Sequence, residues 1–154
     1  MLTSSILLST LIYLLIILRL TILEPIWILE ISLLRHETIK IIGLILVTIG
    51  FIIGIFGMSA MENSWRVGIK YDQKTKLITS GIFRVSRNPY FFSYDMFIIG
   101  YILVFPSIIL FILYVTLAIV FHKMILEEEK YLETVHGISY LDYKKKVNRY
   151  LTLK

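Results

Sequence analysis

Two short polar segments contain most of the residues in this chain that can bind a charged small molecule. They are residues 84–89 (RVSRNP) and three glutamates at 127–129. Pro89 suits the first turn of a helix because its φ is fixed and it lacks an N–H, and Asn88 can cap that helix with its side-chain oxygen. Free N–H groups at the helix start, beside Arg87, favour a carboxylate or phosphate. A capped helix whose arginine reaches the membrane interface explains the same residues more simply, without any ligand.

The glutamates at 127–129 need a positive partner, because carboxylates near the C-terminal end of a helix are disfavoured by the helix dipole. If one helix continues through them, neighbouring side chains point about 100° apart. Glu128 is then predicted to face the 84–89 segment. A carboxylate there can hold a ligand's amino group or ribose hydroxyls, or it can form an internal salt bridge with Arg84 or Arg87. Both alternatives remain open.

The remaining titratable residues have weaker patterns. Asp95 lies in an apolar stretch, where an acid is a functional candidate, although a shallow position near the interface explains it as well. His122 is expected at the interface, and His36 and His136 lack metal-ligand spacing. The chain has no cysteine, so disulfides, thiolate catalysis and cysteine-type zinc sites are excluded. No metal site is predicted.

The composition indicates how these residues are positioned. Of the 154 residues, 57% are hydrophobic, and the mean hydropathy is +0.79. Soluble domains have about 45–50% apolar residues and at this size bury only about two-thirds of the surface of the unfolded chain, so lipid must cover the rest. The formal charge is +5. Basic residues flank the apolar runs, which favours anionic lipid headgroups over nucleic acid as the partner.

The N-terminal half contains two apolar tracts. Residues 6–23 carry a single charge, Arg19, and as a helix they cover roughly 27 Å, close to the hydrocarbon thickness. We expect an uncleaved membrane helix here rather than a signal peptide. Residues 26–34, with one tryptophan, are predicted to lie at headgroup level. Residues 41–61 carry no charge and predict a second membrane helix.

Glycines punctuate that second helix. Gly50 and Gly54 form one GxxxG pair, and Gly57 continues the small surface. Such a surface allows a neighbouring helix to approach closely. Chance is the alternative, because glycine is frequent in membrane helices.

The third apolar tract, residues 96–121, is uncharged and contains Pro106. It predicts either one kinked span or a hairpin that turns near residues 104–107. Of the 16 Lys and Arg residues, 13 lie in the flanking segments, six in 59–88 and seven in 122–154. A hairpin places all 13 on one side of the membrane, as the positive-inside rule requires, and a single span does not. We therefore predict the hairpin.

The limbs of the hairpin are predicted at residues 90–105 and 106–125. The expected fold class is an all-α integral membrane protein with about four transmembrane helices, including this C-terminal hairpin, and an amphipathic cytoplasmic tail helix. It forms one domain over residues 1–154, with N-terminal helices in 1–63 and a cofactor-binding core in 64–154. Both termini and the 59–88 loop are predicted to be cytoplasmic.

Three stretches of the sequence resemble a known family. They are residues 77–89 (LITSGIFRVSRNP), the motif Glu128-Glu129-x-x-Leu132, and the tail Gly137-x-x-Tyr140-x-x-Tyr143 with Val147-x-Arg149. In this order and spacing, over roughly residues 64–151, they are similar to isoprenylcysteine carboxyl methyltransferases. That family in turn resembles the phospholipid N-methyltransferases.

The open end of the hairpin, opposite its turn, is here called its mouth. The resemblance implies an enzyme that encloses S-adenosylmethionine between this mouth and the C-terminal segment. A lipidic or amphiphilic acceptor, with a carboxylate, amine, thiol or phenol, would reach it from the bilayer. The residues implied to bind the cofactor are Lys76, Leu77, Ile78, Phe83, Arg87, Asn88, Pro89, Phe91, Glu128 and Glu129, and Arg149 is the candidate catalytic residue that orients cofactor or acceptor. Methyl transfer from a sulfonium needs mainly positioning and exclusion of water.

The chain departs from the family pattern at two positions. Phe91 replaces a tyrosine, and Met124 replaces a basic residue of the eukaryotic members, which weakens the expectation of an isoprenylcysteine carboxylate as acceptor. Two other functions remain: a non-catalytic membrane protein that retains the fold, and a nicotinamide-dependent membrane reductase. The oligomeric state is not indicated.

Overall fold

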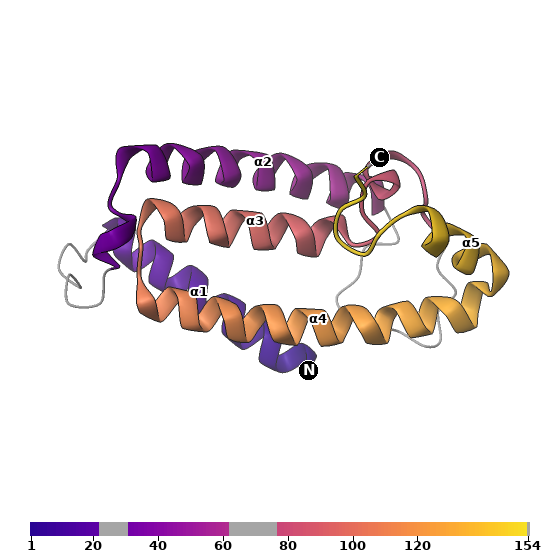
Figure 1. Cartoon of the computed structure of the whole chain (residues 1–154). Coiled ribbons are helices and arrows are strands. Elements are labelled where there is room, and N and C mark those ends of the chain that lie inside the picture. The colour runs from indigo at the N-terminus through magenta and orange to yellow at the C-terminus, as the bar shows by residue number, and fades with distance from the viewer. Residues whose placement is uncertain (22–30, 62–76, 154) are drawn as a thin grey trace.

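The computed structural model describes residues 1–21, 31–61 and 77–153. The segments are the helices α1 (Leu2–Thr21), α2 (Glu37–Met61), α3 (Pro89–Val104), α4 (Ile108–His136) and α5 (Ile138–Lys146), with short 3-10 helices η2 (Ser32–Leu34) and η4 (Gly81–Arg84) (Figure 1). The predicted all-α fold is confirmed. The tryptophan expected at headgroup level, the basic residues of the 62–76 stretch and the predicted cofactor contact Lys76 lie outside the described residues.

Three of the described helices, α1, α2 and α4, are long and apolar enough to cross a membrane. The shorter α3 has 16 residues and covers roughly 24 Å, less than the hydrocarbon thickness of about 30 Å. The predicted count of about four membrane helices is therefore approximately right, and the chain is an integral membrane protein.

The predicted hairpin of α3 and α4 is confirmed, and it turns at residues 105–107. Pro106 is buried there and accepts a hydrogen bond from the Ile31 N–H (3.2 Å), while Ser107 caps α4 by accepting from the Leu110 N–H (3.5 Å). The second limb was predicted to end at residue 125, which is wrong, because α4 continues to His136. The residues that follow position 125 in α4 include Glu, Lys, Tyr and Leu, which are compatible with a helix. The helix ends only before Gly137, whose φ is +52°.

Helices α2 and α3 lie side by side along their lengths (Figure 1). A Cβ added at Gly50 would lie 2.9 Å from the Phe97 backbone nitrogen, and one added at Gly100 would lie 2.6 Å from the Gly43 carbonyl oxygen. Gly54 faces Ser93 across the same contact. The predicted close approach of a helix to this glycine surface is confirmed, and its partner belongs to the same chain.

The larger apolar side chains pack between α1, α3 and α4. The buried cluster contains Ile12, Ile16, Tyr94, Ile98, Tyr101, Ile102, Leu110, Leu117 and Phe121. On α2, by contrast, the buried residues are glycines, and large side chains such as Phe51 and Phe56 are about 60% exposed. We assign that exposed apolar face to lipid contact.

The helices run in alternating directions that bring the polar segments to one end. Gly57 near the end of α2 contacts Pro89 at the start of α3, whereas Gly43 near the other end of α2 contacts the backbone of Gly100. Helix α1 runs in the same general direction as α3, because the Tyr13 ring packs against Tyr94 and, further along both helices, the Tyr101 hydroxyl donates to the Ile16 carbonyl (3.5 Å). Consequently the end of α2, the start of α3 and the C-terminal segment share one end of the molecule (Figure 1).

A second apolar cluster covers that end. Phe83, Tyr140, Tyr143 and Val147 are buried together, with Leu77 and Ile78 partly buried against them. The Tyr143 hydroxyl donates to the Phe83 carbonyl (2.6 Å), and burial raises the pKa of Tyr143 above its ordinary value. This cluster fixes α5 and the residues after it against the segment that leads into α3.

Candidate functional site: an arginine–glutamate network at the mouth of the hairpin

Residues 84–89, which we call the corner before α3, are held in place by hydrogen bonds among themselves and to the C-terminal segment. Pro89 occupies the first helical turn as predicted, and the Ser86 hydroxyl, which is buried, accepts a hydrogen bond from the Asn88 N–H (3.1 Å). The predicted cap by the Asn88 side chain is wrong, because that side chain makes no capping bond. Its amide donates instead to the Arg149 carbonyl (3.2 Å) and, at 3.5 Å, to Glu129.

The C-terminal segment lies along this corner. The Arg87 N–H donates to the Asn148 carbonyl (3.1 Å), and the Thr152 N–H donates to the Val85 carbonyl (2.8 Å). The Ser86 hydroxyl also reaches the Arg149 carbonyl (3.3 Å). Residues separated by about 60 positions are thereby joined, and Arg149 is brought to the mouth of the hairpin.

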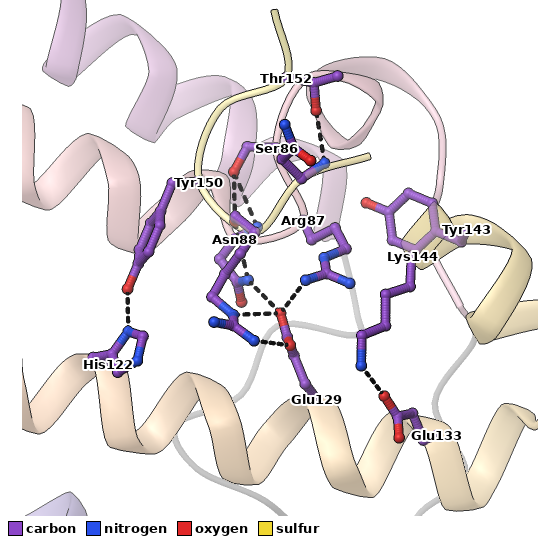
Figure 2. A network of polar contacts seen from close by, with 12 residues as sticks. Ser86, Arg87, Asn88, His122, Glu129, Glu133, Tyr143, Lys144, Tyr150 and Thr152 are labelled. Carbon is purple, nitrogen blue, oxygen red and sulfur yellow. Dashed lines mark hydrogen bonds and ion pairs between the residues drawn. The ribbon is translucent and has the colours of Figure 1, made fainter. Parts of the chain in front are cut away.

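Glu129 is the carboxylate at the centre of the site (Figure 2). Its side chain is 4% exposed. It accepts two hydrogen bonds from Arg149, one from Nε (3.1 Å) and one from Nη2 (2.9 Å), and it pairs with Arg87 Nη2 at 2.9 Å. A carboxylate that binds one guanidinium through both oxygens is among the stronger and more directional pairs in proteins. The hydrogen bonds to Glu129 raise the pKa of Arg149 above its ordinary value.

The acid that pairs with the corner is therefore Glu129 and not the predicted Glu128. Leu117, Phe121, Ile125 and Glu129 are all buried on α4 at intervals of four residues. That interval keeps them on one face of the helix, so the core packing of α4 turns Glu129 inward. Glu128 is half-buried and engaged in other interactions. The internal salt bridge left open in the sequence is present between Glu129 and Arg87.

Arg87 carries donors that the network does not use. Its side chain is 6% exposed, and its Nε and Nη1 atoms are buried without a hydrogen-bond partner among the described residues. Buried donors of a charged group are costly to leave unpaired. They lie on different edges of the guanidinium, so each can donate a separate hydrogen bond to an acceptor such as a ligand carboxylate or phosphate oxygen.

The other predicted cofactor residues are distributed around this network. Phe83 is buried beneath it, with Leu77 and Ile78 partly buried alongside. Phe91 lies one turn into α3, and its ring contacts those of Tyr90 and Phe121. The structure thus joins Arg87, Asn88, Glu129 and Arg149 directly and places the apolar candidates next to them.

One polar pair was not predicted. His122 Nδ1 lies 2.7 Å from the Tyr150 hydroxyl, and the two rings are stacked, with an interplanar angle of 24°. The pair lies about two turns before Glu129 on α4 (Figure 2). Tyr150 directly follows Arg149 in the resembling tail, which was the one signal available. Because His122 and Tyr150 are 28 positions apart, no local sequence pattern indicates their contact.

The site can be compared with known proteins. The profile of the phospholipid methyltransferase family matches residues 38–138, which include α2, the corner before α3, the hairpin and Glu129, and stop before Arg149. Searches of curated proteins and of solved structures gave no significant match. Since the profile matches well over half of the chain, this protein belongs to the phospholipid methyltransferase family.

Proposed function

We propose that this protein, a membrane methyltransferase by family, transfers a methyl group from S-adenosylmethionine to a lipidic or amphiphilic acceptor. The observation that supports this most is the buried carboxylate of Glu129 between Arg87 and Arg149, at the mouth of a membrane hairpin. A zwitterionic ligand needs groups of both signs in one place, and this network supplies them.

The residues of the site fit the chemistry of the cofactor. An unpaired buried N–H of Arg87 can donate to the cofactor's carboxylate, and the acids at 128 and 129 can accept from its amino group or ribose hydroxyls. Leu77, Ile78 and Phe83 offer an apolar surface to its less polar parts. When bound, the cofactor supplies a methyl group on a positively charged sulfur.

The chain itself contributes position and exclusion of water. The C-terminal segment is tied across the corner by the hydrogen bonds of Val85, Arg87 and Thr152, which holds Arg149 in place. Arg149 orients the cofactor or acceptor in this proposal. Holding the two reactants in line can lower the activation barrier of the methyl transfer by up to about 7–11 kcal/mol.

The acceptor is proposed to enter from the bilayer, because the network lies where apolar helices end and polar residues begin. The carboxylate-methylating subtype has less support than a broader amphiphilic class. Met124, where the resembling eukaryotic proteins have a basic residue, is packed against the apolar core and cannot pair with an acidic acceptor.

Cofactor binding is tested by calorimetry on the detergent-purified chain. We expect S-adenosylmethionine to bind, and Glu128→Gln to weaken binding by about 1–3 kcal/mol, the range for loss of a charged hydrogen-bond partner. Glu128 is a better probe than Glu129, whose replacement would also break the network. Glu127→Gln, an exposed neighbour, is the matched control and should bind like the parent.

Other binding results would contradict the proposal. A chain that binds NADPH and not S-adenosylmethionine supports a reductase, and one that binds neither supports a non-catalytic protein. Affinity unchanged in Glu128→Gln removes Glu128 from the site. Turnover is then followed with radiolabelled cofactor in native membranes, where the label should enter lipid-extractable product.

We also propose that the network faces the cytoplasm, because Arg84, Arg87 and the three lysines at the end of α5 lie at its end of the molecule. A reporter fused at Ser107 should then lie outside, and one fused after Lys154 should lie inside. Accessibility of both reporters from the same side of the membrane would contradict this topology.

A further inference from the structure

Asp95 is an acid within the hairpin that the arginine–glutamate network does not use. It lies in the second turn of α3, and its Oδ1 atom is buried without a hydrogen-bond partner among the described residues. On the facing helix α4, the Tyr114 hydroxyl lies within hydrogen-bonding reach of the carboxylate. Tyr114 is its one side-chain hydrogen-bond partner in the described part of the chain.

Tyr150 connects Asp95 to the network. Its hydroxyl lies close enough to Asp95, Arg149 and Glu129 to be affected by the charge of each, and burial, followed by the Asp95 charge, raises the pKa of Tyr150 above its ordinary value. The hydroxyl is held by His122 at 2.7 Å. Asp95 therefore lies further into the hairpin than the corner, and the Tyr150 hydroxyl is near enough to interact electrostatically both with Asp95 and with the Arg149–Glu129 pair.

A carboxylate in this place requires an explanation. An acid in a membrane helix is costly, and it normally pairs with a cation or has a function. Among the described residues no salt bridge neutralises Asp95, and the ion pairs of the site both involve Glu129. A tyrosine hydroxyl satisfies only one of its two oxygens. The other oxygen is free to accept a proton or a hydrogen bond from a ligand.

We infer that Asp95 is a catalytic residue that accepts the proton released by the methyl acceptor. This inference rests on the proposed function. A lone pair on the nitrogen, oxygen or sulfur of the acceptor forms the new bond to carbon, and the carbon–sulfur bond of the cofactor breaks with its electron pair left on sulfur. The proton on the acceptor atom passes to Asp95 Oδ1, so charge and atoms balance without a further reactant.

The position of Asp95 also selects among acceptors. A carboxylate in a region of low dielectric attracts an ammonium group and repels a second carboxylate. An acceptor that is already an anion has no proton to give. The acceptor class that fits is therefore amphiphilic and proton-bearing, and a long-chain primary amine represents it best.

Asp95→Asn tests the inference on the full-length chain in lipid nanodiscs with radiolabelled S-adenosylmethionine and dodecylamine. We expect methyl transfer to fall at least about 100-fold, the lower range for loss of a general base. The affinity for S-adenosylmethionine, measured by calorimetry, should stay within about twofold of the parent if Asp95 acts on the acceptor alone. Asp95→Glu should recover part of the rate. Asp142→Asn, the same change at an exposed position of α5, should leave both values unchanged.

A dependence on pH separates proton transfer from a structural role. In the parent the rate should fall as acidification protonates Asp95. The residual activity of Asp95→Asn should lack this contribution and follow only the protonation of the amine acceptor itself. Tyr114 of α4 and Tyr150 of the C-terminal segment, backed by His122, face Asp95. All three remain in the variant, so the comparison isolates Asp95.

Two outcomes overturn the inference and leave the proposed function intact: turnover within about threefold of the parent in Asp95→Asn, or loss of cofactor binding in that variant. A measurement on the parent is independent of any folding defect. Methylation of dodecanoate in preference to dodecylamine contradicts a proton-accepting Asp95. If the parent does not bind S-adenosylmethionine, it is the proposed function that fails.

Discussion

Replacement of Glu129 by glutamine is expected to lower the free energy of unfolding by about 3–5 kcal/mol, the range for removing one partner of a buried ion pair. The reason is the position of Arg87, whose side chain is 6% exposed and pairs with Glu129. Without the carboxylate, its charge is left in a region with little water. Arg149 is 29% exposed and can regain hydration, so most of the cost comes from Arg87. Denaturation of the purified protein in detergent measures the change.

The control for Glu129→Gln lies one turn further along the same helix. Glu133 pairs with Lys144, and both side chains are at least one-third exposed. Exposed pairs of this kind contribute about 0–1 kcal/mol, so Glu133→Gln should have a small effect. Equal destabilisation by both variants would show that Glu129 is not the centre of the network. The Glu129 variant should also loosen residues 147–152, detectable as faster amide hydrogen exchange.

Gly100→Ala is expected to lower the free energy of unfolding by about 1–3 kcal/mol, the usual cost of overpacking. The added Cβ would lie 2.6 Å from the Gly43 carbonyl oxygen and 2.7 Å from the Val47 nitrogen. Both are backbone atoms, so neither can move without separating α2 from α3. Since these helices present few large side chains to each other, close backbone packing is what holds them together.

Gly57→Ala is the matched control for this contact. The nearest atom to a Cβ at Gly57 is 3.5 Å away, an ordinary van der Waals distance. Alanine is also favoured over glycine within a helix, by about 1 kcal/mol. The stability of this variant should therefore equal or exceed that of the parent, as measured by thermal unfolding in the same detergent. A similar loss in both variants would contradict the role assigned to the Gly100 contact.

Much of the architecture was predictable because lipid imposes simple requirements on a chain. A long run without charge must form a helix in the bilayer, which predicted α1, α2 and the hairpin. The distribution of basic residues predicted that the apolar tract around Pro106 turns back. Because the chain turns back there, the two limbs begin and end on the same side of the membrane, and the corner at 84–89 and the acids at 127–129 must lie near each other.

The details of the site were less predictable, and Glu128 and Asn88 show why. Choosing among three consecutive glutamates requires the rotation of α4 to within a fraction of a turn. That rotation is set by Leu117 and Phe121, which pack with residues of α1 and α3 in the buried cluster. Asn88 has a typical capping position, yet its amide donates to Arg149 and Glu129, residues that follow it by 61 and 41 positions.

The sequence by itself thus determined that this chain is a helical membrane protein with a hairpin and which polar segments meet at its mouth, because span length, charge and turn residues are local properties. The tertiary structure decided that Glu129 joins the two arginines, and that Asp95 has Tyr114 as its hydrogen-bond partner. Side-chain partners depend on how each helix is rotated and on where the C-terminal segment returns, and both are fixed by contacts between residues far apart in the chain.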